Sequence, residues 1–266
     1  MNIPAAAGQA GDLPYATVVQ VAKAANAQVG LLATQETSEA EDNAALDETL
    51  PSSRWQHFTA SSENDLLVKR DRWALTTPDR LPSTVDPTGR HMLVSDITLL
   101  SKGKAHVSPH RDLTHAALNW TARADWDPFV FCGTHLVSGV YAGNDNLDWR
   151  KAARSEEFAG LHDNIAWWLA AGLNVLLCLD SNWPDMPPVV PGWVWAVQGG
   201  HNGIDKIGYV NAPGSNWEFS FLSHEVYANA SDHDFQVANL RATGLTPPPT
   251  PSAMQRFGAF LRRMTS

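Results

Sequence analysis

A chain of 266 residues is at the upper end of what one hydrophobic core organises, so a single large domain is expected. Apolar residues make up 44% of the chain and charged residues 18%, below the roughly 25% of an average soluble protein, which excludes a disordered or low-complexity chain. The 19 basic and 28 acidic residues give a net charge of −9. This charge excludes a basic coat for non-specific nucleic-acid binding, so contact with a polyanion would need a local patch or a metal ion.

The same overview predicts a cytoplasmic protein. Cys132 and Cys178 lie in apolar runs and are expected to be buried thiols. No stretch approaches the roughly 18 uninterrupted apolar residues of a membrane helix. No basic segment leads into an apolar one at the N-terminus, so no signal peptide is expected. No protein partner is indicated, and we expect a monomer.

The first half of the chain predicts one helix and three strands. Residues 14–27 have the apolar spacing of a helix packed on one face, with Pro14 in its first turn. The apolar runs 29–33, 65–69 and 92–100 predict strands.

The second half predicts strands at 129–132, at 173–179 and around Phe235 and Val237. Residues 147–171 predict a long helix that ends at Gly172. Its expected core face consists of Phe158, Leu161, Ile165, Trp168 and Leu169. The irregular alternation of strands and helices indicates an α/β or α+β sandwich rather than a regular βαβ array. The expected catalytic domain covers residues 1–244, and residues 245–266 form a Pro-rich linker and a short basic tail.

Polar residues suited to metal or phosphate chemistry stand next to most of these strands. They are Gln35-Glu36, Gly133-Thr134-His135-Leu136, Asp180-Ser181-Asn182, Gly203-Ile204-Asp205-Lys206-Ile207 and Ser231-Asp232-His233. Each has an ordinary structural explanation, such as a surface turn, an Asx turn, a strand cap or a core histidine. Because ligands of α/β proteins bind at strand ends, the five motifs together predict one shared pocket.

The order of these motifs resembles that of the endonuclease/exonuclease/phosphatase superfamily, over roughly residues 1–240. The resemblance implies a four-layer α/β sandwich, with two mostly antiparallel sheets packed face to face between helices. It also implies hydrolysis of phosphoric esters by an attacking water. Three features differ from the family pattern: the full strand before Asn2 is absent from the sequence, Leu179 replaces a glycine, and Gly133 replaces an asparagine.

The resemblance assigns roles residue by residue. Glu36, Asp232 and Asn2 are the expected metal ligands, and their oxygen donors suit Mg²⁺ or Mn²⁺. His233 would be oriented by Asp205, and Asp180 competes with this pair for positioning or deprotonating the water. Asn182 would donate to a phosphate oxygen, and His135 would contact the phosphate or the leaving group. Which group accepts the proton stays open.

Three functions are compatible with this site. The first is a metal-dependent phosphodiesterase that cleaves DNA or RNA. The second is a phosphatase or phosphodiesterase acting on a small-molecule or lipid phosphate, and the third is a catalytically inactive binding module.

Two further groups of residues have open interpretations. His106, His110 and His115 form a histidine cluster that would need a fourth ligand to hold zinc. Trp183, one of 11 tryptophans, either belongs to the packed core or stacks on a base of the substrate.

Overall fold

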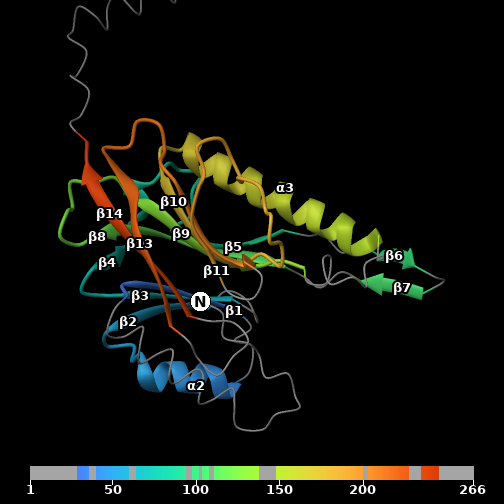
Figure 1. Ribbon diagram of the computed structural model, residues 1–266. Coiled ribbons are helices and arrows are strands. Elements are labelled where there is room, and N and C mark those ends of the chain that lie inside the picture. Colours follow the sequence, from blue (N-terminus) through green and yellow to red (C-terminus); the bar gives the residue numbers. More distant parts are fainter. Residues whose placement is uncertain are drawn as a thin grey trace, which may run out of the picture.

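The computed structural model describes residues 29–35, 40–59, 64–93, 98–101, 104–107, 111–137, 148–199, 203–227 and 235–245. The elements in chain order are β1 (Leu31–Gln35), α2 (Ala40–Thr49), β2 (Trp55–Thr59), β3 (Asn64–Lys69), β4 (Trp73–Leu75), the short 3-10 helix η1 (Pro78–Arg80), β5 (Thr88–Met92), β6 (Thr98–Ser101), β7 (Lys104–Val107), β8 (Asp112–Trp120), β9 (Phe129–His135), α3 (Asp148–Ala170), β10 (Asn174–Asp180), β11 (Val194–Gly199), β12 (Asp205–Val210), β13 (Trp217–Tyr227) and β14 (Phe235–Gly244) (Figure 1). The helix expected over residues 14–27 and the tail after residue 245 lie outside the described residues.

A seven-stranded sheet forms the centre of the protein. Its strands follow the order β11-β12-β10-β9-β8-β4, and β5 also pairs with β8. Neighbouring strands are antiparallel except β9 and β10, which run parallel. Parallel neighbours need a long crossover, and α3 lies between these two strands in the sequence.

Helix α3 covers one face of this sheet because its apolar residues recur along one side. Leu161, Ile165 and Trp168 are fully buried, as the sequence predicts. The helix ends in a Schellman motif, in which Gly172 has a φ of 82°. The main-chain N–H groups of Gly172 and Leu173 donate to the carbonyls of Leu169 and Trp168 at 2.9 and 3.0 Å. None of the described helices is long and apolar enough to cross a membrane.

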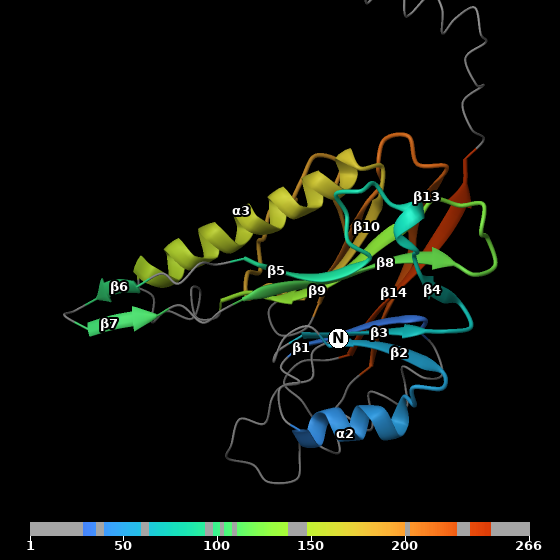
Figure 2. The same cartoon turned by 180° about the vertical axis from the view of Figure 1, so that it is seen from behind.

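Three hydrophobic cores separate the layers of the sandwich. The first lies between α3 and the seven-stranded sheet. The second lies between that sheet and a three-stranded antiparallel sheet of order β1-β3-β2, and the third lies between the three-stranded sheet and α2. Figures 1 and 2 show α3 and α2 on opposite outer sides of the two sheets. The predicted α/β sandwich is therefore confirmed.

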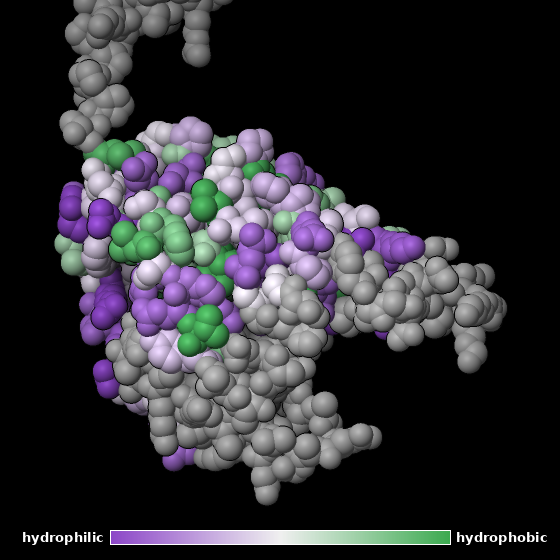
Figure 3. Space-filling model, viewed as in Figure 1, coloured by the Kyte–Doolittle hydropathy of each residue, from purple (hydrophilic) through white to green (hydrophobic). Residues whose placement is uncertain are grey.

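The hairpin of β13 and β14 contacts two of these cores. Trp217 and Phe219 at the start of β13 pack between the sheets, and Phe235 at the start of β14 packs in the core that contains α2. The register shifts between Phe221 and Ser223, and residues 221–226 of β13 are exposed. Figure 3 shows hydrophobic residues among hydrophilic ones on the face of the molecule that is turned to the viewer in Figure 1. A bulge bends a strand, which explains why β13 leaves the core at this point.

One predicted strand is wrong. Residues 92–100 were expected to form a single strand, but β5 ends at Met92 and β6 begins at Thr98. β5 pairs with β8 in the large sheet, whereas β6 pairs with β7 in a separate hairpin. The apolar run therefore covers the end of one strand and the start of another, and apolar character alone does not mark such a boundary.

Candidate active site

Three predicted site residues lie side by side across the seven-stranded sheet. Asp180, the last residue of β10, is paired with His135 at the end of β9 and with Asp205 at the start of β12. Paired residues on neighbouring strands are about 5 Å apart. All three are at least 95% buried. Because β12 runs antiparallel to β10, its beginning, rather than its end, meets this edge of the sheet.

The side chains of this row face the space between the two sheets. Successive residues of a strand point to opposite faces, so Asp180 shares its face with Cys178, and Asp205 shares its face with Ile207. Cys178 and Ile207 belong to the core between the sheets. The row is therefore the polar end of an otherwise apolar layer.

The three-stranded sheet also contributes polar residues at this end. Gln35 and Asn64 are paired at the ends of β1 and β3, and each is 1% exposed. Asn64 Nδ2 donates to the main-chain oxygen of Asp112 at 3.3 Å, which joins the two sheets. Gly133 makes the close approach possible, because a Cβ there would lie 3.3 Å from Ala33 Cβ. Neither polar atom of the Gln35 amide has a hydrogen-bond partner in the described part of the chain.

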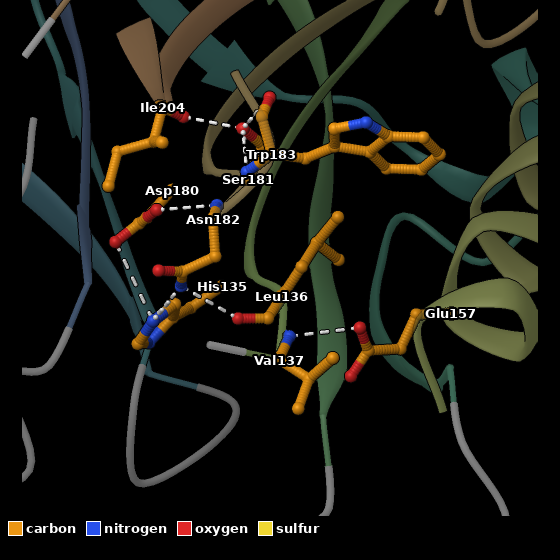
Figure 4. Close-up of polar contacts among 9 residues, drawn as sticks. All are labelled: His135, Leu136, Val137, Glu157, Asp180, Ser181, Asn182, Trp183 and Ile204. Carbon is orange, nitrogen blue, oxygen red and sulfur yellow. Dashed lines mark hydrogen bonds and ion pairs between the residues drawn. The ribbon is translucent and has the colours of Figure 1, made fainter. Parts of the chain in front are cut away.

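His135, Asp180 and Asn182 form the hydrogen-bonded centre of the site (Figure 4). Asn182 Nδ2 donates to Leu136 O at 3.0 Å and lies 3.0 Å from His135 Nε2. Asp180 Oδ2 lies 3.6 Å from the same ring nitrogen. With one amide hydrogen on Leu136, the second is directed at Nε2, which accepts it when the imidazole is neutral. A protonated imidazole would turn instead to the Asp180 carboxylate, so this nitrogen has a partner in either state.

The main chain of Asn182 is shaped by an Asx turn. Asn182 N donates to Asp180 Oδ1 at 2.8 Å, and Ser181 Oγ donates to Ile204 O at 2.6 Å. Asn182 has a φ of 45°, and among the described residues no other non-glycine residue has a positive φ. The Asx turn considered in the sequence analysis is therefore present, and it also holds the Asn182 side chain against His135. Uncommon main-chain geometry of this kind concentrates at functional sites.

Lys206 anchors the loop that precedes Asp205. Its Nζ donates to Pro184 O and Gly203 O at 2.8 Å and to Gln198 Oε1 at 3.2 Å. Three acceptors match the three donors of an ammonium group. Burial lowers the pKa of Lys206 to about 8. No role was predicted for Lys206 from its motif; the signal that could have identified one is a positive charge inside a buried strand.

Gly199 is the point where the β13–β14 hairpin meets the row. Gly199 pairs with Asp205, and a Cβ on it would lie 2.7 Å from Gln236 Cδ. Gln236 Oε1 in turn lies 2.6 Å from His224 Nε2. A larger residue here would therefore displace the Gln236 side chain, which packs on the strand that pairs with Asp205.

Four predicted site residues lie outside the described residues. They are Asn2, Glu36, Asp232 and His233. Glu36 directly follows Gln35, and His233 stands two positions before Phe235, the first residue of β14. The described residues next to them in the sequence thus lie at the polar end of the sandwich.

The donors described at this end suit a cation that prefers oxygen. Asp180 and Asp205 supply carboxylates, and Gln35 supplies a buried amide oxygen without a hydrogen-bond partner in the described segments. Such oxygen donors fit Mg²⁺ or Mn²⁺. The described residues contain no group of three or more His, Cys, Asp and Glu side chains that could hold a metal, so the predicted ligand set stays a proposal.

The predicted histidine cluster is only partly described. His115 is 2% exposed, and its ring stacks on His91 with centroids 4.8 Å apart and contacts Trp168 at 5.1 Å. Burial lowers the pKa of His115 to about 4. The side chains of His106 and His110 lie outside the described residues. The described contacts of His115 are those of a neutral core histidine.

Trp183, which follows the Asx turn at Asn182, packs against α3. The Arg154 guanidinium lies 4.5 Å from the centre of its ring, and Phe158 meets it edge to face at 5.6 Å. One face of the indole is therefore already covered. These contacts favour a packing role over stacking on a base.

Glu157 is a buried residue next to the site that the sequence analysis missed. Its carboxyl is fully buried on α3, and Oε2 accepts a hydrogen bond from Val137 N at 2.9 Å. Glu157 precedes Leu161 by four positions and thus lies on the same helix face. An acidic residue on the predicted apolar face was the signal that could have identified it.

A cavity of about 510 Å³ also lies between the two sheets, lined mainly by apolar residues of β1, β14 and the large sheet. His135, Asp180, Asn182 and Asp205 do not line it. This cavity therefore does not coincide with the polar row, which remains the candidate active site.

Several solved structures share the fold of this chain. An endonuclease/exonuclease/phosphatase family protein from Bacteroides thetaiotaomicron is 14% identical, with a TM-score of 0.59 over 86% of this chain and 89% of that chain. The human Nocturnin catalytic domain with bound sulfate is 15% identical, with a TM-score of 0.60 over 91% and 93% of the two chains. A mannosyl-6-phosphatase from Bacteroides thetaiotaomicron is 14% identical, with a TM-score of 0.56 over 85% and 90%.

These similarities establish the fold. The chain has the endonuclease/exonuclease/phosphatase fold, as the motif order predicts. No protein-family model matches the sequence, and no curated protein sequence matches it.

Proposed function

We propose that this protein is a metal-dependent phosphodiester hydrolase that cleaves DNA or RNA by attack of water on phosphorus. The observation that carries the proposal is the buried row of His135, Asp180 and Asp205, with Asn182 hydrogen-bonded beside it. This row lies at one end of a sandwich whose fold is shared with phosphatases. In this proposal the layers α3, large sheet, small sheet and α2 correspond to the four-layer sandwich of that superfamily.

Asp180, Asn182 and His135 would act directly on the phosphate and the water. A phosphodiester needs stabilisation of the charge that develops on its oxygens. The second amide hydrogen of Asn182 would become available for this purpose when a protonated His135 turns to Asp180. The Asp180 carboxylate would orient the attacking water or accept its proton. His135 Nε2 lies near both residues. It would accept from Asn182 when the imidazole is neutral and face the Asp180 carboxylate when the imidazole is protonated.

Asp205 would orient His233 and favour its cationic form. Two observations support this pairing: His233 stands two positions before β14 in the sequence, and Gln236 of β14 packs on Gly199, the partner of Asp205. The pair would then support the negative charge of the transition state.

Glu36, Asp232 and Asn2 would hold Mg²⁺ or Mn²⁺. Adjacent Cα atoms are about 3.8 Å apart, so Glu36 is tethered to Gln35 at the polar end of the sandwich. When bound, the cation would neutralise the phosphate charge. The buried Gln35 amide, which lacks a hydrogen-bond partner in the described segments, is a further oxygen donor at this end.

A phosphomonoester or lipid phosphate is the second candidate substrate. The net charge of −9 favours it, because an acidic protein repels a long polyanion. One protein of similar fold is a mannosyl-6-phosphatase, a name that points to a small substrate for that protein.

The test is hydrolysis by the purified protein of plasmid DNA, RNA, an abasic duplex and para-nitrophenyl phosphates, with Mg²⁺, with Mn²⁺ and with EDTA. We expect metal-dependent cleavage of nucleic acid, and a loss of about a hundredfold or more in kcat for Asp180→Asn and Glu36→Ala. Asp163→Asn is the matched control, because Asp163 is 81% exposed on α3. Cleavage of the small esters alone would favour the second candidate. Absence of hydrolysis with either metal, or an unchanged Asp180→Asn variant, would refute the proposal.

A further inference from the structure

Glu157 connects helix α3 to the main chain that follows His135. The side chain is fully buried, and Oε2 accepts a hydrogen bond from Val137 N at 2.9 Å. The other oxygen, Oε1, is buried without a hydrogen-bond partner in the described part of the chain. Figure 4 shows Glu157 reaching from α3 to the segment that carries His135 and Leu136.

The residues next to Val137 hold the candidate catalytic groups in place. Leu136 N donates to Asp180 O at 2.9 Å, and Leu136 O accepts from Asn182 Nδ2 at 3.0 Å. The same Asn182 amide lies 3.0 Å from His135 Nε2. A shift of the main chain at Val137 would therefore move the carbonyl that orients Asn182.

The hydrogen bond alone does not explain why an acid occupies this position. A glutamine has the same shape, and its amide oxygen could accept from Val137 N without a buried charge. Burial raises the pKa of Glu157 to about 7, opposed by the Val137 N–H, Arg111 and Arg154 and reinforced by Glu156. The carboxyl thus changes charge near neutrality, under the influence of Arg111, which directly precedes β8, and of Arg154 on α3.

We propose that Glu157 is a positioning residue that sets the place of His135 and Asn182 through the main chain of residues 135–137, and that it does so in its ionised form. An ionised acceptor forms a hydrogen bond roughly twice as strong as a neutral one. Ionisation would therefore tighten the segment, and protonation would loosen it. The effect on hydrolysis rests on the proposed function, whereas the coupling between Glu157 and Asn182 does not.

The test compares the wild type with Glu157→Gln, Glu157→Asp and the control Asp163→Asn by amide NMR across a pH series. In the wild type and the control, the Val137 amide and the Asn182 side-chain amide should shift together with a midpoint near pH 7. Glu157→Gln should abolish this common transition. Glu157→Asp keeps the charge but has a shorter reach, so its titration should no longer move Asn182.

Kinetics provide the second readout. For Glu157→Gln we expect kcat to fall about tenfold with KM nearly unchanged, the scale for losing a residue that orients a catalytic group. The rise of kcat through neutral pH should also disappear. A wild-type protein that hydrolyses nothing but shows the coupled titration would refute the proposed function alone. The role of Glu157 would be overturned by either of two results. One is an Asn182 side-chain amide shift that does not change when Glu157 ionises, and the other is a Glu157→Gln variant with wild-type kcat at every pH.

Discussion

Glu157 imposes a pH-dependent cost on folding that Glu157→Gln should remove. Burial raises the pKa of its carboxyl from the ordinary value of 4.5 to about 7. The folded state therefore binds the proton more tightly than the unfolded state, and stability falls as pH rises from 4.5 to about 7. This interval corresponds to about 3 kcal/mol. Because glutamine does not titrate, the stability gained by the variant should be about 2 to 3 kcal/mol greater at about pH 8 than at about pH 5.

Urea denaturation of the wild type and the variant at both pH values measures this difference. Comparing the two proteins at each pH cancels the titration of the other groups and any constant effect of the new amide. Asp163→Asn, an exposed carboxylate on the same helix, should show almost no pH-dependent difference. Equal stability differences at both pH values would mean that Glu157 titrates normally in the folded protein, and the reasoning from its burial would be wrong.

The other expected outcomes concern packing and the turn at the site. Gly208→Ala should destabilise the fold by about 1–3 kcal/mol in urea, because its Cβ would lie 2.6 Å from Trp193 Nε1; a wild-type midpoint would contradict this. Lys206→Met should cost about 1 kcal/mol or more, since it leaves the partly buried carbonyls of Pro184 and Gly203 without this donor; thermal denaturation measures the loss. Asn182→Ala should be about 1 kcal/mol less stable than Asn182→Gly, because only glycine accepts the positive φ freely; equal stabilities would exclude strain. His115→Gln should remove up to about 3 kcal/mol of acid destabilisation between pH 6.5 and about 4, measured by urea denaturation.

The long apolar segments could be predicted from the sequence. The strand expected over residues 129–132 and the strand expected over 173–179 lie within β9 and β10, and the helix expected over 147–171 is α3. Each is buried on one or both faces, and burial produces the apolar pattern that identifies it. Helix α2 was missed because the described side chains place mainly Leu46, with Leu50 just beyond the helix, in the core.

The placement of the site depends on strand pairing, which local patterns do not encode. Each motif could be recognised beside a strand, but the row of His135, Asp180 and Asp205 exists because β9 is parallel and β12 antiparallel to β10. A shift of one residue in either register would turn a side chain to the other face. Pairing of β5 with β8 likewise brings His91 onto His115, and packing of β14 against β11 brings Gln236 onto Gly199.

Two buried groups in the layer under α3 have opposite effects on acid stability. Glu157 lowers stability as pH rises from 4.5 to about 7, because its pKa is raised. His115 raises stability as pH rises from about 4 to 6.5, because burial lowers its pKa below the ordinary 6.5. The two intervals overlap and the two effects are similar in size, so they nearly cancel in the wild-type protein. A flat wild-type profile across this range would therefore be consistent with two strongly perturbed groups. Replacing either residue by glutamine should leave the pH dependence of the other uncompensated in the profile of the variant.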